Sequence, residues 1–489
     1  MIWCRRLRPL LIASSLAGAL LVCAGTRTVA AAPSDFPEPP ALRTQIHFWQ
    51  KVFAVYSQHQ IVFHDPEHLG RVYSVLDFRD RAAAGEGPLA LDAIERAAIT
   101  VERERIRGVL RRLDARQDNS GGLDDEERKI WNLFANDKDP HRFAAAADPD
   151  RIRTQRGLRE RFAEGVRVSR RYLGEMEEIF RHEGLPPELT RLPLVESCFD
   201  IDAYSKVGAA GIWQFMPSTG RNYMAVSGVI DERRDPLRAT RGAAAHLKEN
   251  FEALGSWPLA ITAYNHGRAG VARAVRETGS TDIGVIVQRY HGNLFGFASR
   301  NFYAEFLAAL EVERHYKEYF GDLEFGAPFT GDEVQLSTAL AGAVAARCAD
   351  VPAEDLAALN PAVDSAVFRG DGNIPRGYLL RVPPGTSGAF EQRLAQIAAD
   401  ARVVAVVRTR PGRGAAKGSS LRAATRSRAG SRPDARIAAS GYRTHTVAPG
   451  QTLSHIAQHY RVSVAKLRDA NSLRSNNVKT GQVLKIPAG

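Results

Sequence analysis

Apolar positions along the chain predict helices over most of its first half. Between Ile94 and Leu113 they recur at the spacing of a helix with one buried face, as at Ala98 and Ile106. Residues 114–122 are polar and rich in Asp, Asn and Gly, which predicts a loop between two helices. We therefore expect the region from 32 to 180 to be helical after a Pro-rich start.

A second apolar stripe follows Pro186-Pro187-Glu188, where proline is tolerated in a first helical turn. Leu189, Leu192 and Glu196 then fall at i, i+3 and i+7, on one face. A Glu on such a stripe is costly unless it is paired or protonated, because desolvation raises its pKa. A carboxyl that keeps its proton near neutral pH suits a general acid for glycosidic cleavage. The alternative is a Glu at a helix end that pairs with a nearby Arg or Lys.

Polar and aromatic residues alternate with glycines in the run from Ser205 to Pro217. Glycines allow tight turns and a close approach of ligand to the backbone. We expect Trp213 and Phe215 to offer flat faces to sugar rings, and Ser205 and Gln214 to offer hydrogen bonds.

A helix that starts near Pro258 closes with Ala263-Tyr264-Asn265-His266-Gly267. The Tyr264 hydroxyl and the Asn265 amide at its end are candidate orienting groups. Each of these residues, taken singly, also suits core packing or helix capping.

The N-terminus has the three parts of a secretory signal. Arg5, Arg6 and Arg8 precede an apolar run from Pro9 to Ala24, and small residues follow at 28–32. We expect a signal peptide over 1–31 and an exported protein in the periplasm or cell envelope. An uncleaved anchor and a lipidated Cys23 are the alternatives that would associate it with a membrane. After cleavage Cys198 and Cys348 remain, and we expect two separate thiols.

Composition is ordinary for a globular protein, with 44% hydrophobic and 25% charged residues, which excludes a polytopic membrane protein. The net charge of +11 is concentrated between 408 and 440, where eight Arg and one Lys face one Asp. This basic stretch has no aromatic residues, so we do not expect nucleic acid as a partner. It belongs to a flexible linker over 386–441, which is either a plain tether or a contact to a membrane or an anionic wall.

The segment 330–385 has an internal relative at 442–489. Leu356 to Asn360 pairs with Leu467 to Asn471, and Gly377 to Pro383 pairs with Gly481 to Pro487. Small repeated units of this kind are usually binding modules.

Glu196-Ser197, the Gly-x-Trp-Gln-Phe-Met-Pro run and Ala-Tyr-Asn-x-Gly occur in this order within about 70 residues. The region 181–325 thereby resembles the soluble lytic transglycosylase family, in its membrane-bound lytic murein transglycosylase D group. The resemblance implies a mainly helical, lysozyme-like fold that cleaves peptidoglycan without a metal or cofactor. It makes Glu196 the single catalytic acid and base. Positions that line the sugar cleft correspond to Ser205, Gln214, Met216, Tyr264 and Asn265.

Near the domain's end the family often has a cleft Tyr, where this chain has Phe302 followed by Tyr303. We take Tyr303 as the corresponding substrate-binding residue, with either a shifted register or a missing hydroxyl as its explanation. His266 replaces the small residue that the family often has after Ala-Tyr-Asn, and we expect it to be exposed or capping.

The segment 442–489 resembles LysM, a small β-α-α-β module that binds chains containing N-acetylglucosamine. Its glycan-binding positions correspond to Gly450, Thr452, Leu453 and Asn471. The unit at 330–385 lacks the LysM opening, so it is a degenerate LysM that either binds glycan or caps the catalytic domain.

The sequence thus predicts an exported lytic transglycosylase whose LysM holds it on peptidoglycan. Cleavage would proceed by attack of the muramic acid's own C6 hydroxyl and leave 1,6-anhydro ends. The alternatives are a hydrolytic muramidase of the goose type, which would need a placed Asp such as Asp200 or Asp202, and a non-catalytic wall-binding scaffold. We expect Asp200 and Asp202 to be turn or surface residues.

Overall fold

The computed structural model describes residues 35–397, 399–402 and 443–447, together with residues 453, 456, 457, 460, 462, 464–471, 473 and 482–486. The predicted signal peptide, most of the basic linker, and Gly450 and Thr452 lie outside these residues. The chain divides into two compact units, Met1–Val407 and Arg408–Gly489. Within the described ranges, no helix combines the length and apolar character needed to cross a membrane.

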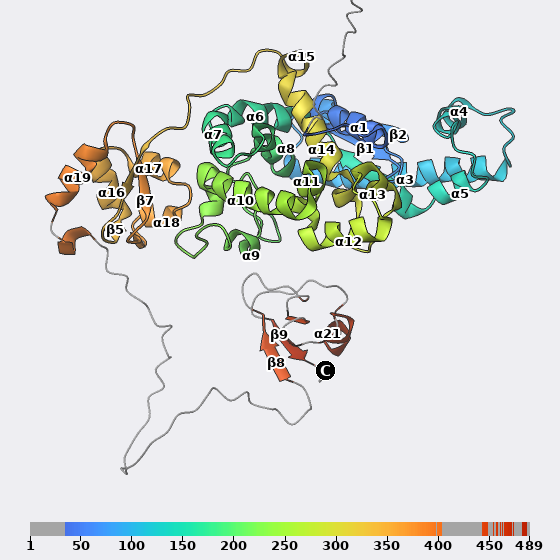
Figure 1. Ribbon diagram of the computed structural model, residues 1–489. Helices are drawn as coiled ribbons and strands as arrows, with labels where there is room; N and C mark the ends of the chain where they lie inside the picture. The colour runs from blue at the N-terminus through green and yellow to red at the C-terminus, as the bar shows by residue number, and fades with distance from the viewer. Residues whose placement is uncertain are drawn as a thin grey trace, which may run out of the picture. The chain divides into compact units, whose positions relative to one another are not determined.

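The N-terminal part of the first unit combines helices with a small sheet (Figure 1). Its elements are η1 (Pro40–Leu42), α1 (Arg43–Ala54), β1 (Gln60–His64), β2 (Val72–Asp77), α2 (Arg79–Ala83), α3 (Pro88–Ala115), α4 (Asp125–Asn132), α5 (Arg142–Ala146), η2 (Pro149–Arg151), β3 (Arg153–Arg156), α6 (Arg159–Ser169) and α7 (Leu173–His182). The predicted helix at 94–113 and the loop at 114–122 are confirmed.

The expectation of a wholly helical N-terminal region is wrong, because β2, β1 and β3 form a three-stranded antiparallel sheet. Gln60-Ile61-Val62-Phe63-His64 is rich in β-branched and aromatic residues, which favour a strand. Successive side chains of a strand point to opposite faces. Ile61 and Phe63 accordingly join a core built with α3, whereas Val62 joins the core of the central helices.

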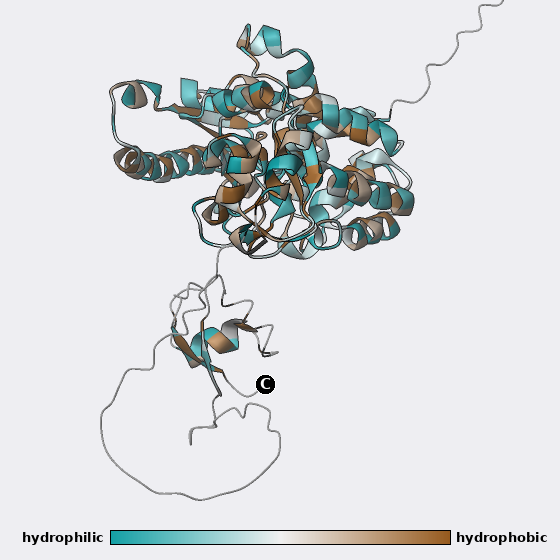
Figure 2. Ribbon diagram, turned by 90° about the vertical axis from the view of Figure 1, so that its left-hand side faces the viewer, coloured by the Kyte–Doolittle hydropathy of each residue, from teal (hydrophilic) through white to brown (hydrophobic). Residues whose placement is uncertain are grey.

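Helices make up the central part of this unit. Its elements are η3 (Pro187–Arg191), α8 (Leu192–Glu196), α9 (Pro217–Gly220), η4 (Glu232–Arg234), α10 (Pro236–Leu254), α11 (Trp257–His266), α12 (Arg268–Thr278), α13 (Ile283–Arg289), α14 (Phe297–Arg314) and α15 (Tyr316–Phe320). Apolar and polar residues alternate around the helices, as expected when one face of each is buried (Figure 2).

The main core forms around α14, and α1 packs directly against that helix. The indole nitrogen of Trp49 donates to the side-chain oxygen of Asn301 at 3.3 Å, across 252 positions of sequence. The region before 60 therefore completes the same core that carries the predicted site motifs.

The segment 330–402 forms a smaller core beside the central helices. Its elements are β4 (Asp332–Gln335), β5 (Leu340–Ala341), α16 (Gly342–Ala349), α17 (Ala353–Leu359), α18 (Ser365–Phe368), β6 (Asn373–Ile374), β7 (Leu379–Val382), α19 (Ser387–Ala395) and η5 (Ala399–Arg402). β4 pairs with β7 in antiparallel register, so this segment has the β-α-α-β order predicted for a LysM-like unit.

Main-chain hydrogen bonds and a buried ion pair join this segment to the central helices. The Asp231 amide donates to the Ala362 carbonyl at 2.7 Å, and the Asp364 amide donates to the Val229 carbonyl at 2.9 Å. Arg381 and Asp235, both buried, form an ion pair at 3.0 Å. These bonds attach the 330–402 segment to the central helices, so both belong to the first unit.

In the second unit, β8 (Arg443–Thr446) pairs in antiparallel register with β9 (Val483–Ile486). The helix α21 (Val464–Ala470) lies between these strands in sequence, as the LysM resemblance predicts. Its core contains Val447, Leu453, Ile456, Ala457, Leu467, Leu484 and Ile486. The mainly α fold with small β-α-α-β units is thus confirmed.

The internal repeat extends to individual contacts. The side chain of Asn471 accepts a hydrogen bond from the Lys485 amide at 2.6 Å and donates one to the Lys485 carbonyl at 2.7 Å. Asn360 accepts from the Arg381 amide at 2.8 Å and donates to the Arg381 carbonyl at 2.7 Å. In both units the same Asn holds the last strand against the end of the second helix.

Candidate functional site

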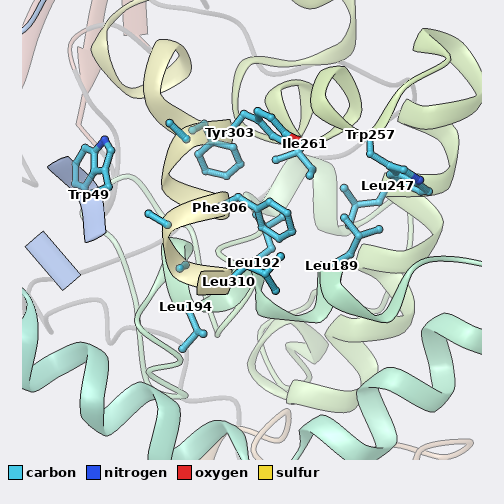
Figure 3. Packing of buried hydrophobic residues seen from close by; sticks show 14 of the residues in the cluster. Trp49, Leu189, Leu192, Leu194, Leu247, Trp257, Ile261, Tyr303, Phe306 and Leu310 are labelled. Atoms are coloured by element: carbon cyan, nitrogen blue, oxygen red, sulfur yellow. The ribbon is translucent and has the colours of Figure 1, made fainter. Parts of the chain in front are cut away.

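The predicted apolar stripe before Glu196 is present, but it is divided between two short helices. Leu189 lies in η3 and Leu192 begins α8, and both side chains are fully buried. Figure 3 shows Leu189 and Leu192 among the packed side chains of the main core. Glu196 is the last residue of α8, so the core fixes the position of this carboxyl group.

The chain reverses immediately after Glu196. Cys198 and Phe199 have left-handed φ angles of 52° and 57°, which non-glycine residues seldom adopt. The amides of Ser197 and Phe199 both donate to the Pro193 carbonyl at 3.0 Å, which closes this turn. Strained backbone of this kind persists only where surrounding contacts determine it.

Glu196 is a half-buried carboxyl group, and no described residue forms a hydrogen bond or ion pair with it. Although part of the side chain reaches the surface, its carboxyl group is surrounded by protein atoms. Burial raises the pKa of Glu196 to about 8. The group therefore keeps its proton at neutral pH, as a general acid requires.

The loop between Ala203 and Phe215 is folded tightly beside α8. The Ser205 hydroxyl accepts a hydrogen bond from the Ala209 amide at 2.9 Å, and the Ser205 amide donates one to the Ala209 carbonyl at 2.8 Å. The Gln214 side-chain amide donates to the Gly211 carbonyl at 2.8 Å. Both predicted polar residues thus hold the loop's own main chain.

Buried Arg233 joins the middle of this loop to its last residue. Its guanidinium group donates to the Gly208 carbonyl at 2.8 Å and to the Phe215 carbonyl at 2.9 Å. Gly211 has a φ of 71°, and a Cβ atom there would collide with the Arg233 carbonyl oxygen. Glycine is therefore required at 211 for both conformation and space.

Tyr264 in α11 connects the loop to the predicted orienting residues. Its hydroxyl donates to the Trp213 carbonyl at 2.9 Å. Burial, reinforced by the charge of Glu196, raises the pKa of Tyr264 well above its usual value. The phenol is therefore neutral and lies close enough to Glu196 for their charges to interact.

Two parts of the chain match known domain families. Residues 176–287 match the Transglycosylase SLT domain family, and residues 445–487 match the LysM domain family. Residues 176–287 are a transglycosylase SLT domain. The match includes Glu196, the 203–215 loop and Tyr264, and it ends before α14.

Among the relatives of the chain is the membrane-bound lytic murein transglycosylase D of Escherichia coli K12. It is 30% identical over 325 residues, which cover 63% of this chain and 62% of the relative, and the protein from E. coli O6:H1 matches equally. The chain thus spans less than two thirds of the relatives' length. An inactive mutant of the lytic transglycosylase Slt from Pseudomonas aeruginosa is 18% identical, with coverage of 51% of this chain and 39% of that chain and a TM-score of 0.28.

Two aromatic residues of the SLT domain do not have the role expected from the sequence. Trp213 is fully buried, stacks on Phe180 and donates from its indole nitrogen to Thr240 at 2.9 Å. Phe215 is also buried. The expectation that Trp213 and Phe215 offer their faces to sugar rings is wrong, because both rings support the loop from inside the core.

Other side chains in and next to the 203–215 loop are exposed instead of Trp213 and Phe215. Tyr204 is 69% exposed, Val207 73% and Met216 39%. Met216 was predicted from the family motif, whereas Tyr204 has no motif to mark it. Tyr204 is therefore an exposed aromatic residue of this loop, whereas Trp213 is buried.

Asn265 and His266 meet Ser299 of α14. The Ser299 hydroxyl donates to the Asn265 side-chain oxygen at 3.0 Å and lies 3.2 Å from the His266 ring nitrogen Nδ1. Asn265 is exposed and His266 half-buried. The end of α11 is therefore tied to α14 while the Asn265 side chain remains accessible.

Tyr303 lies away from this accessible surface. Its side chain is buried, and its hydroxyl donates to the Pro37 carbonyl at 2.8 Å. Phe302 is buried as well. The structure does not bring Tyr303 together with the other predicted site residues, because its phenol fixes the N-terminal segment to α14.

Asp200 and Asp202 are exposed, and Asp200 accepts from the Asp202 amide at 3.0 Å. This is the turn geometry expected for them.

Cys198 and Cys348 are both free, as predicted. In the LysM unit, Leu453 is a core residue, and Asn471 bonds to the β9 main chain.

Glu305, a second carboxyl group whose titration responds to the charge of Glu196, was not predicted from the sequence. It lies in α14, outside the residues matched to the SLT family, and it is half-buried. Burial and the charge of Glu196 raise the pKa of Glu305 to about 8, while Arg153 acts in the opposite direction. No local motif could have revealed it, because Glu305 and Glu196 are brought together only by the packing of α14 on α8.

Proposed function

We propose that this protein is a lytic transglycosylase that cuts the β-1,4 bond between N-acetylmuramic acid and N-acetylglucosamine in peptidoglycan. One observation carries the proposal: Glu196 is a buried carboxyl group that has no hydrogen-bond or ion-pair partner in the described part of the chain and is held at the end of α8 within an SLT domain. The names of the E. coli relatives, which are murein transglycosylases, support the same substrate.

In the proposed reaction, Glu196 gives its proton to the glycosidic oxygen that leaves C1 of N-acetylmuramic acid. The resulting carboxylate then takes the proton of that sugar's C6 hydroxyl, whose oxygen bonds to C1. The product has a 1,6-anhydro end, and Glu196 is protonated again. An internal nucleophile of this kind is equivalent to a reactant at ~10⁵ M or more, so one carboxyl group suffices.

The other site residues divide into two roles. Ser205, Gln214 and Tyr264 hold the loop, since their polar atoms bond to its main chain. Met216 and Asn265 are exposed and contact the sugar, together with Tyr204.

Mass spectrometry of muropeptides released from purified peptidoglycan tests this function. We expect products lighter by one water than the corresponding reducing-end forms. Reducing ends would assign a hydrolytic muramidase, and no release would leave a binding scaffold. Glu196→Gln should lower the rate by at least about 10²-fold. Glu311→Gln, on the accessible side of α14 beside His315, should leave the rate unchanged and serves as the control.

We also propose that the LysM unit retains the enzyme on glycan strands and that the 330–385 unit is a structural cap. The main-chain bonds to Ala362 and Asp364 and the buried Arg381–Asp235 pair support the cap. Removal of residues 442–489 should therefore abolish sedimentation with insoluble peptidoglycan. Undiminished sedimentation would contradict the LysM assignment and place retention in the SLT domain, the linker or the 330–385 unit.

We propose an exported protein of the cell envelope, because residues 1–31 have the pattern of a secretory signal and the E. coli relatives are named membrane-bound. The basic stretch at 408–440 would contact a membrane or anionic wall polymers. N-terminal sequencing of protein recovered from the envelope should begin near Pro33. A start at Met1 would identify an uncleaved anchor.

A further inference from the structure

A cavity of about 360 Å³ lies where the start of the 203–215 loop meets the 330–385 unit. The residues that line it come from three segments of the first unit, 202–204, 227–234 and 362–364. Ligand pockets in proteins commonly have volumes of about 300–1,000 Å³, so a cavity of this size can hold a small polar group of a larger ligand.

Main-chain contacts fix the shape of the cavity. Ile230 and Val363 form an antiparallel bridge beside the two main-chain hydrogen bonds that attach the 330–385 unit to the central helices. On its other side, the Cα atom of Arg234 lies 3.3 Å from the place that a Cβ atom would take at Gly211. The 227–234 segment therefore packs between the loop and the 330–385 unit, and the cavity needs both of them.

Arg234 supplies a positive charge at the wall of the cavity. Its side chain is half-buried, and within the described part of the chain it forms no ion pair and donates no hydrogen bond. The neighbouring Arg233, in contrast, holds the Asp231 carboxylate through bonds of 2.8 and 2.6 Å. A guanidinium group without a partner favours a ligand carboxylate, which it can bind through two parallel hydrogen bonds.

Asp202 and Asp364 supply the available negative charges. Among the described residues, the Asp202 carboxylate has no hydrogen bond or ion pair. Asp364 accepts from the Ala366 amide at 2.8 Å through one oxygen only. The described part of the chain holds no cluster of three or more His, Cys, Asp or Glu side chains suited to a metal ion. The cavity thus offers separate positive and negative groups, which fit a ligand with both a carboxylate and an ammonium group.

Tyr204 connects the cavity to the proposed sugar site. This residue lines the cavity, and its side chain is 69% exposed beside the loop. Its bridge to Ala210 and the 2.9 Å bond from the Gly211 amide to the Ala203 carbonyl hold this wall of the cavity to the rest of the loop. In peptidoglycan the peptide stem is attached to N-acetylmuramic acid. The stem of a sugar that contacts Tyr204 therefore leaves the ring next to the cavity.

We propose that this cavity binds the peptide stem of peptidoglycan, at a stem amino acid whose side chain ends in both an amine and a carboxylate, as that of diaminopimelate does. Arg234 takes the carboxylate, and Asp202 and Asp364 take the ammonium group. The inference rests on the proposed function, because the stem reaches the cavity when its sugar is bound by the SLT domain. The 330–385 unit then takes part in substrate recognition as well as in structure.

Isothermal titration calorimetry of the full chain with soluble stem tripeptides tests the site without any cleavage. One peptide ends in diaminopimelate, and the other ends in lysine, which keeps the amine and lacks the carboxylate. We expect the diaminopimelate peptide to bind about tenfold more tightly or better, because only its carboxylate pairs with Arg234. Equal affinities, or no binding of either peptide, would overturn the proposal.

Variants assign the two charges of the ligand to their partners. Arg234→Gln should remove the preference for the diaminopimelate peptide without weakening the lysine peptide. Asp364→Asn should weaken both peptides, while the new side chain can still cap α18. The matched controls, Arg241→Gln on α10 and Asp371→Asn in the 330–385 unit, are at exposed positions and should change neither affinity. A preference that survives Arg234→Gln would contradict the part assigned to this residue.

Cleavage of intact peptidoglycan, compared with glycan strands stripped of their stems, tests the same site during the reaction. Arg234→Gln should lower the rate on intact peptidoglycan at least about threefold more than the rate on stripped strands. An equal loss on both substrates would give Arg234 a structural role only and overturn the proposal. If wild type cleaved neither substrate, the proposed function would fail, and calorimetry would still decide whether the cavity binds the stem.

Discussion

Ser197 donates a hydrogen bond from its hydroxyl to the carbonyl oxygen of Ile212 at 3.0 Å. The next carbonyl along the chain, that of Trp213, accepts from the Tyr264 hydroxyl at 2.9 Å. Two consecutive peptide groups of the loop therefore hold the residue after Glu196 on one side and the end of α11 on the other. This pair of bonds sets the distance between Glu196 and the loop.

Ser197→Ala should lower kcat while KM changes little. The substitution removes a bond worth about 0.5–1.5 kcal/mol and leaves the buried Ile212 carbonyl without this donor. We expect kcat to fall about three- to tenfold in a muropeptide release assay. Ser218→Ala, at an exposed position, is the control. An unchanged kcat would show that this bond does not position Glu196.

Gly211→Ala should unfold the loop between Ala203 and Phe215. A methyl group at 211 requires both a strained φ and displacement of the Arg233 main chain. We expect a loss of roughly 3 kcal/mol or more in the free energy of unfolding, measured with denaturant. Gly228→Ala should cost less than about 0.5 kcal/mol, because a Cβ atom there has nothing within 4 Å. Similar losses for both variants would disprove the steric argument.

Arg381→Ala should loosen the attachment of the 330–385 unit. Among the described residues it leaves Arg238, whose Nε lies 3.6 Å away, as the remaining charged partner of the buried Asp235 carboxylate, which also accepts from the amides of Leu237 and Arg238. Breaking a buried ion pair costs about 3–5 kcal/mol, so Tm should fall markedly in calorimetry. Arg369→Ala, on the exposed end of α18, should change Tm little. An undisturbed Tm in Arg381→Ala would mean that the ion pair does not support the cap.

Both carboxyl groups of the site should make stability depend on pH. Their pKa of about 8 in the folded protein exceeds the value of about 4.3 for an unfolded Glu. Their contribution to stability is complete below about pH 4.3, declines as the pH rises and levels off above about pH 8. Glu196→Gln and Glu305→Gln should therefore raise Tm relative to wild type at pH 8.5 and much less at pH 4.5. Equal differences at the two pH values would contradict the raised pKa.

The fold was predictable where sequence pattern and local packing agree. The helix at 94–113 and the repeated Asn360 and Asn471 were found because a helical period and a repeated motif are local signals. The strand at 60–64 was missed, because five residues are too few to distinguish a strand from one turn of a buried helix.

The site was predictable in its centre and not at its edges. Glu196 was selected from the sequence because the motifs that follow its apolar stripe resemble those of a known family, whereas the stripe alone also suited an ordinary paired Glu. Trp213 was misplaced, since a motif contains no information about which aromatic ring faces the core. Glu305 was missed because it lies more than 100 positions from Glu196 and no spacing rule connects them. What the sequence could not supply was the long-range packing of α14.

The hydrogen bond between Trp49 and Asn301 has a consequence for biosynthesis. The two residues are 252 positions apart, and at roughly 5–20 residues per second a ribosome needs about 13–50 s to travel from one to the other. During that interval α1 lacks the helix against which it packs, and the core around it stays open. A nascent chain in this state is a suitable cargo for a translocation channel that accepts only unfolded polypeptide. If the proposed signal directs export, the late arrival of α14 would leave the chain unfolded while it is translocated.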